Sequence, residues 1–146
     1  MAITQALANS FKKELLEAEH NFKQTGGDKF KIALYTSSAT LNSATTSFTT
    51  TNEVANSGQY VSGGGALSNL GTSIASGVAI VDYADRSFTG VTLTARGALI
   101  YNTSATTANA AVAALDFGAD KTATSGTFTI QFPAFTTAAA ILRISG

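Results

Sequence analysis

The stretch of sequence that decides the fold is Val91-Thr92-Leu93-Thr94-Ala95-Arg96-Gly97-Ala98-Leu99-Ile100-Tyr101. Residues 91–96 alternate between apolar and polar side chains, which is the period of a strand with one buried face. Gly97 predicts a bulge or a bend. Residues 98–101 are apolar throughout, as is typical of a central strand. This part of the chain is therefore predicted to form strands in the middle of a β structure.

Strand patterns recur on both sides of this stretch. Residues 30–35 alternate in the same way, whereas 37–51 contains so few large apolar residues that we expect a long loop or a weak edge strand. Gly118 and Pro133 are expected to end two later strands. The strand that Gly118 ends is predicted at 112–117, and the strand that Pro133 ends is predicted at 127–132. Two further strands are predicted at 78–83 and 141–144. About eight short strands with no helices between them predict a mainly β fold, an antiparallel β-sandwich or jelly-roll-like domain.

The first part of the chain has a different period. Apolar residues recur at spacings of three and four from Ile3 to Phe22, which predicts an amphipathic helix over residues 4–21. The sequence Thr25-Gly26-Gly27-Asp28 then turns the chain. A helix this short is marginal alone, so its apolar stripe is expected to pack on the sandwich or on a neighbouring subunit. The predicted organisation is an N-terminal helical arm at 1–25 and a β-sandwich domain at 26–146.

The composition restricts the classes of function. A chain of 146 residues is long enough for one domain with its own core. Its formal net charge of zero argues against binding nucleic acid or an anionic membrane, because both require clustered basic residues. No apolar run approaches the ~18 residues of a membrane-spanning helix, and the first residues lack a secretory signal pattern. We therefore expect synthesis and assembly in a cytoplasm.

The charges are unevenly distributed along the chain. Nine of the eighteen charged residues lie in the first 31 positions, and Glu53 is the only charged residue between Ile32 and Val81. A monomer normally relies on surface charge for solubility. A weakly charged surface of Thr, Ser, Ala and Gly is therefore consistent with coverage by other subunits. An ordinary solvated, Thr-rich sheet explains the composition equally well.

The single histidine and a run of three glycines are the first candidates for a reactive or ligand-binding site. His20 is the only histidine, and it is expected to be a solvated helix residue because no nucleophile pattern accompanies it. Gly63-Gly64-Gly65 is not followed by the lysine of a phosphate-binding loop. A tight turn or a close backbone approach is the preferred interpretation of the three glycines.

Acidic and aromatic residues are the remaining candidates for a metal site or a sugar-binding face. Five acidic residues could bind calcium only if loops brought three of them together, so turn formation by Asp is the preferred interpretation. The sequon Asn102-Thr103-Ser104 is short enough to arise by chance. Aromatic residues in strands are more often part of a core than of a sugar-binding face. The acidic residues are Glu53, Asp82, Asp85, Asp116 and Asp120, and the aromatic residues are Tyr35, Phe48, Tyr60, Tyr83, Phe88, Tyr101 and Phe135. We therefore predict no catalytic, cofactor-binding or metal-binding residue and no enzymatic activity.

Several phrases, in order along most of the chain, resemble those of a known family. The chain is similar in these phrases to small structural proteins of tailed-bacteriophage virions, and the segment 88–102 is the strongest match. The resemblance implies a shared β fold and transfers no functional residue. The phrases are Asn9-Ser10-Phe11-Lys12-Lys13-Glu14-Leu15-Leu16, Phe30-Lys31-Ile32-Ala33-Leu34-Tyr35-Thr36, Thr51-Asn52-Glu53-Val54, Gly58-Gln59-Tyr60, Gly63-Gly64, the segment 88–102, Leu115-Asp116-Phe117-Gly118-Ala119-Asp120-Lys121 and Gly126-Thr127-Phe128-Thr129-Ile130-Gln131-Phe132.

The resemblance implies a role in the virion. The leading hypothesis is a capsid decoration, or cement, protein that clamps neighbouring major capsid subunits, with a homo-trimer as the favoured oligomer. The alternative is a tail, baseplate or fibre component that takes part in host-surface recognition, and its partners would be tail proteins. A hydrolase such as a depolymerase is a third hypothesis, which the single histidine and the lack of a paired-carboxylate motif disfavour. We expect the protein in the virion, assembled in the cytoplasm of a bacterial host, without nucleic-acid or membrane partners and without a cofactor.

Overall fold

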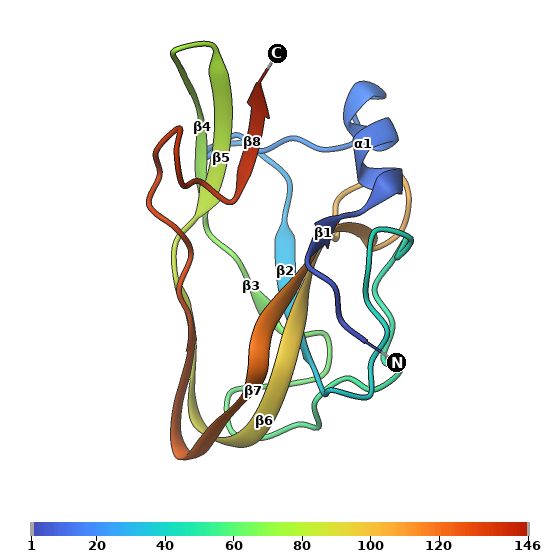
Figure 1. Ribbon diagram of the computed structural model, residues 1–146, viewed down its shortest axis with the longest axis vertical. Helices are drawn as coiled ribbons and strands as arrows, with labels where there is room; N and C mark the ends of the chain where they lie inside the picture. Colours follow the sequence, from blue (N-terminus) through green and yellow to red (C-terminus); the bar gives the residue numbers. More distant parts are fainter. Residues whose placement is uncertain (1, 146) are drawn as a thin grey trace.

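The computed structural model describes residues 2–145 and is mainly β, with one short helix near the N-terminus (Figure 1). All the named strand pairs are antiparallel. The predicted mainly β, sandwich-like fold with an N-terminal helix is confirmed. The elements are β1 (Ala6–Leu7), α1 (Asn9–Leu16), β2 (Phe30–Tyr35), β3 (Gly65–Ala66), β4 (Asn69–Ala75), β5 (Val78–Tyr83), β6 (Arg86–Asn102), β7 (Ala110–Ile130) and β8 (Leu142–Ser145).

The strands form two sheets. The larger sheet has the order β1-β7-β6-β2-β3 and the smaller has the order β4-β5-β8. Strands β6 and β7 pair over most of their length, and in Figure 1 this ribbon bends at the lower end and rises again below the smaller sheet. The pairing shifts register at Phe88/Val91, Val91/Leu93 and Ala95/Gly97. Such bulges bend a ribbon, so the predicted irregularity at Gly97 is confirmed and one hairpin reaches both layers.

The core lies around β2. Its residues pair with 97–102 of β6, and Ile32, Leu34 and Leu99 are completely buried. The irregular chain between β2 and β3 packs against the same sheet and contributes the buried side chains of Leu41 and Tyr60. The expectation of a loop over 37–51 is confirmed, since the segment forms only isolated bridges.

The predicted helix over residues 4–21 is too long at both ends. Residues 6–7 form β1, which pairs with β7 through Ala6 and Ala114 at the edge of the larger sheet. The helix ends at Leu16, and Ala18 has a positive φ of 62° that a helix does not permit. The division into 1–25 and 26–146 stays a prediction. Phe22 and Phe30, on either side of residue 25, stack with their ring centroids 4.7 Å apart in one core.

Two strand predictions also need correction. β4 was not predicted, because its sequence Asn69-Leu70-Gly71-Thr72-Ser73-Ile74-Ala75 lacks a regular alternation of apolar and polar residues and depends on pairing with β5 for its structure. Gly118 does not end a strand, since β7 continues from Ala110 to Ile130 through this residue, which has a φ of 81°. The strand predictions at 30–35 and 78–83 match β2 and β5.

Candidate functional site

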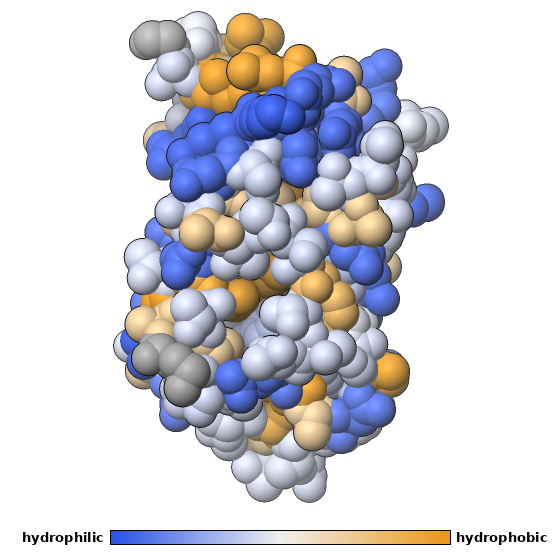
Figure 2. Space-filling model, turned by 90° about the vertical axis from the view of Figure 1, so that its right-hand side faces the viewer, coloured by the Kyte–Doolittle hydropathy of each residue, from blue (hydrophilic) through white to orange (hydrophobic). Residues whose placement is uncertain are grey.

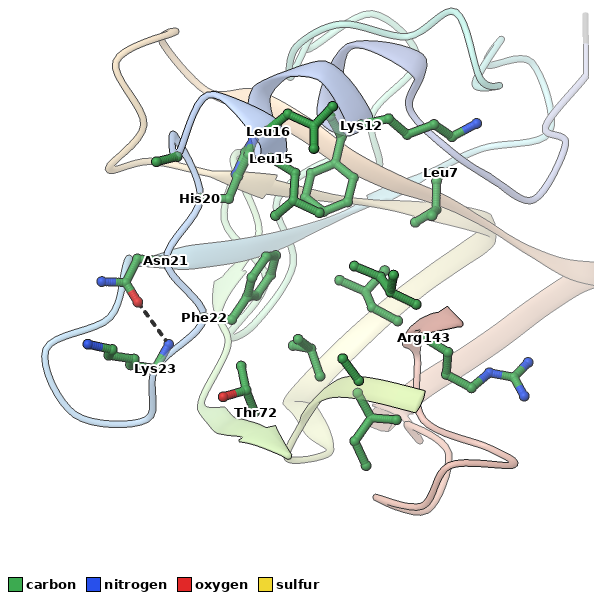
Figure 3. Close-up of a pocket in the computed structure, with 17 residues that line it drawn as sticks. Leu7, Lys12, Leu15, Leu16, His20, Asn21, Phe22, Lys23, Thr72 and Arg143 are labelled. Carbon is green, nitrogen blue, oxygen red and sulfur yellow. Dashed lines mark hydrogen bonds between the residues drawn. The ribbon is translucent and has the colours of Figure 1, made fainter. Parts of the chain in front are cut away.

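The two layers separate at one end and leave a groove of about 670 Å³ between α1 and the smaller sheet (Figure 3). Directly opposed residues on antiparallel strands share a face. The pairings place Thr72, Val81 and Leu142 in one row and Ala79 and Ile144 in the next, and all five line the groove. The opposite wall comes from the helix and the chain after it, with Phe11, Leu15 and Phe22. The inner face of the smaller sheet is therefore only partly covered by the rest of the chain.

Large apolar side chains are exposed around this end of the molecule. Leu16 is 90% exposed, Ile74 is 72% exposed and Ile144 is 59% exposed. Figure 2 shows hydrophobic residues gathered at the top of the molecule, above a band of hydrophilic residues. A contiguous apolar patch of this kind marks an interaction surface more often than single exposed residues do. Sequence reasoning missed the site; the available signal was Leu16, which extends the apolar face of the helix beyond its regular stripe.

The groove has basic residues at its ends. Lys12, Lys23 and Arg143 line it, and no acidic side chain is among the described residues that do so. In Figure 3 Lys12 and Arg143 lie at one end and Lys23 lies at the other. The Lys12 ammonium donates to Asn9 Oδ1 at 3.4 Å and the Arg143 guanidinium donates to the Ala138 carbonyl at 2.7 Å. Within residues 2–145, none of the three basic side chains has a carboxylate partner.

A buried polar network underlies the helix wall of the groove. The expectation of a solvated His20 is wrong, because the helix ends before it and the chain turns its ring into the core, where the side chain is fully buried. His20 Nε2 lies 3.0 Å from Glu14 Oε1, and Nδ1 lies 3.0 Å from Asn102 Nδ2. The ring also packs edge-on against Phe11, with the centroids 4.9 Å apart. The imidazole of His20 thus contacts Asn102, which lies 82 positions away in the chain.

The hydrogen bonds determine what the imidazole can do. The Asn102 amide nitrogen can only donate, so Nδ1 of His20 accepts and Nε2 carries the hydrogen that is donated to Glu14. The second amide hydrogen of Asn102 is donated to Asp28 Oδ2 at 2.7 Å, and Asn102 Oδ1 accepts from the Ser104 amide at 2.8 Å. Both ring nitrogens are therefore engaged with protein groups. The arrangement holds the chain after α1 onto β6, and it leaves neither nitrogen free to take a proton from a nucleophile.

The three-glycine segment forms a close backbone approach, as predicted. Gly64 has a φ of 82°, and a Cβ atom there would lie 1.8 Å from the Ile32 carbonyl oxygen. Beside it, Glu53 Oε2 accepts hydrogen bonds from the Tyr60 hydroxyl and the Gly63 amide, both at 2.7 Å. Burial and the neighbouring carboxylate raise the pKa of Tyr60. These contacts fix the loop on β2 and assign the glycines a structural role.

The acidic residues weighed for calcium lie apart. No group of three His, Cys, Asp or Glu side chains suited to a metal ion occurs among residues 2–145. Asp85 accepts from the Phe132 amide at 2.8 Å, and Asp116 pairs with Arg96 at 3.0 Å. A hydrogen bond from the Gly118 amide, together with Arg96, lowers the pKa of Asp116. The turn interpretation is wrong for Asp82, Asp116 and Asp120, which lie within strands.

Asp82 is the least favourably placed of these groups. Its side chain is completely buried, Oδ1 accepts from the Tyr83 amide at 2.9 Å, and Oδ2 has no partner in the described part of the chain. Burial raises the pKa of Asp82, although the hydrogen bond from the backbone amide of Tyr83 partly opposes the effect. The carboxylate therefore reduces the stability of the fold when it is ionised.

The aromatic residues form a core and not a sugar-binding face. Tyr35, Tyr60, Tyr83, Phe88 and Tyr101 are buried, and Phe48 stacks on Tyr101 with the centroids 4.8 Å apart. The prediction that these residues are part of the core is confirmed, with Phe135 as the exposed exception. Asn102 of the sequon is completely buried, although Thr103 and Ser104 are exposed.

Comparison with known proteins found no matching family model, no matching curated protein and no matching solved structure. In the described residues, no helix has the length and apolar character needed to cross a membrane.

Proposed function

We propose that this chain is a structural protein of a tailed-phage virion and acts as a capsid decoration protein that clamps neighbouring major capsid subunits. The observation that carries the proposal is the apolar end, where Leu16, Ile74 and Ile144 are exposed around an open groove. Such a surface is stabilised when another protein covers it. The resemblance to virion structural proteins supplies the setting.

Burial of surface, repeated over many copies, supplies the mechanism. A standard protein interface buries about 1,600 Å², and a symmetric shell repeats the same contact at every equivalent position. The two-layered core, to which β2, residues 97–102 of β6 and residues 110–115 of β7 contribute buried residues, provides a rigid body behind the apolar end. A trimer at threefold or quasi-threefold positions would place three such ends against the neighbouring capsid subunits.

Capsid stability tests the proposal directly. Particles with and without this protein are heated, and DNA release is followed with an intercalating dye. The proposal expects release at a lower temperature from the particles that lack it, and restoration of the higher temperature after the purified protein is added back. Equal release temperatures would overturn the clamp function.

Copy number separates the head from the tail. A decoration protein is expected in hundreds of copies per virion, whereas a tail, baseplate or fibre component is expected in about a dozen to a few dozen, as follows from the symmetry of each structure. A quantitative gel of purified virions, calibrated on the major capsid protein, measures this number. A count in the dozens would favour the tail assignment and reject the decoration assignment.

A further inference from the structure

We propose that the groove between α1 and β8 receives an extended apolar segment of another virion protein, with acidic residues near both of its ends. The segment would add to β8 as a further strand of the smaller sheet. This inference rests on the proposed function, because the partner is a neighbouring protein of the particle. Three features of the groove support it: a free strand edge, an uncovered apolar face and charged lining residues that are all basic.

The free edge belongs to β8. This strand is last in the order β4-β5-β8 and pairs only with β5, through residues such as Leu142 and Ile144. Among residues 2–145, no backbone hydrogen bond reaches its other edge. Figure 1 places β8 between β5 and α1, and side chains from both β8 and α1 line the groove. An extended segment lying there would pair its backbone with this edge, as in other cases of strand addition.

The apolar face gives the segment its side-chain preference. Strand addition on β8 would continue the rows that now end at Leu142 and Ile144, so alternate side chains of the segment would point between the layers. There they would contact Phe11, Leu15 and Phe22 on the opposite wall. Large apolar residues at alternate positions fit this environment, and they would cover Ile144, which is 59% exposed without a partner.

The charge specifies the ends of the segment. Lys12 and Arg143 lie at one end of the groove and Lys23 lies at the other, with no acidic side chain among the described residues that line it (Figure 3). Carboxylates near both ends of a bound segment would lie close to these basic groups. A second copy of this chain is a poorer fit, since its exposed apolar residues Leu16 and Ile74 lie beside the basic groove itself.

Photo-crosslinking in assembled virions tests the occupant. A benzoylphenylalanine residue is introduced at Leu16, an exposed residue of α1 that lines the groove, and at Thr89, an exposed residue of β6 outside it. After irradiation, mass spectrometry identifies the crosslinked peptides. The proposal expects a peptide of a different virion protein, rich in apolar residues and flanked by Asp or Glu, from position 16 and not from position 89. A crosslink to a second copy of this chain, to a basic segment, or to no protein would overturn it.

Substitutions give an independent measure of the same contact. Ile144→Asp is expected to lower the affinity for particles lacking the protein by about tenfold or more, as for a residue in the centre of an interface. Val61→Asp changes a residue of similar exposure, 56%, outside the groove, and it should leave binding unchanged. Lys23→Glu should also weaken binding, whereas Lys121→Glu, at another exposed lysine, should not.

The outcomes separate the inference from the function on which it rests. Thermal melts of the free variants first establish that each one is folded. If the wild-type protein binds particles and Ile144→Asp binds equally well, the groove is not the docking site, although the virion assignment stands. If the wild-type protein is absent from virions and does not bind particles, the proposed function itself fails.

Discussion

Replacement of His20 by alanine tests whether the buried network joins the N-terminal segment to the sheet. The change removes the hydrogen bonds from His20 to Glu14 and to Asn102, both 3.0 Å long, together with a ring packed against Phe11. A buried polar group that loses its partner costs about 1–3 kcal/mol, and the cavity left by the ring adds to this cost. We expect a loss of about 3–5 kcal/mol in the free energy of unfolding, a large part of the ~5–15 kcal/mol typical of a domain.

Urea denaturation followed by far-UV circular dichroism measures this loss, since the chain contains no tryptophan. The midpoint should fall while the dependence on urea concentration stays the same, because the extent of unfolding does not change. Lys13→Ala is the control on the same segment, as its side chain is 75% exposed, and it should leave the midpoint nearly unchanged. Equal midpoints for the two variants would refute the structural role of the network. The double variant His20→Ala/Asn102→Ala would support this role if its loss in free energy of unfolding differs from the sum of the losses in the two single variants.

Three further substitutions have expected outcomes in the same assay. Gly64→Ala should cost about 3 kcal/mol or more because its Cβ would collide with β2, whereas Gly118→Ala, with a similar φ and open space around it, should cost about 1 kcal/mol. Asp82→Asn should stabilise the protein by about 1–3 kcal/mol at pH 7. Because the pKa of Asp82 is raised in the folded state, the stability of the wild-type protein falls as pH rises through that pKa. The stabilisation by Asp82→Asn should therefore vanish near pH 3, where the carboxyl group is protonated. A stabilisation that does not change with pH would contradict a destabilising buried carboxylate at Asp82. Tyr60→Phe should lose about 1–3 kcal/mol with its hydroxyl hydrogen bonds, whereas Tyr83→Phe should be nearly neutral because that buried hydroxyl has no partner in the described chain.

The parts of the fold that the sequence predicts are those with a strong local period. Residues 30–35 and 78–83 alternate in hydrophobicity and form β2 and β5. The period misleads where pairing with a distant strand decides the structure. Ala6–Leu7 matches a helical stripe but forms β1, because β7 offers it a free edge. Asn69–Ala75 has a weak pattern and becomes a strand only through its pairing with β5.

The site is less predictable than the fold because it joins separate parts of the chain. Phe11 and Leu142 line opposite sides of one groove, yet they lie near opposite ends of the sequence. His20 likewise acquires its role from Asn102, and only the folded chain brings them together. The aromatic residues were predictable as core, since large apolar groups in strands are buried in most folds. Leu16 was an available signal in the sequence, but its degree of exposure depends on where the helix ends and on what the smaller sheet leaves uncovered.

Electron cryomicroscopy of intact virions is the most direct test of the central claim. At a resolution that separates strands, the bent ribbon of β6 and β7 identifies the chain without reference to any other structure. The proposed function predicts copies at threefold or quasi-threefold positions of the head, with the end that carries Leu16, Ile74 and Ile144 against neighbouring capsid subunits. Density for this fold on the tail alone, or on a head with the apolar end facing solvent, would contradict it.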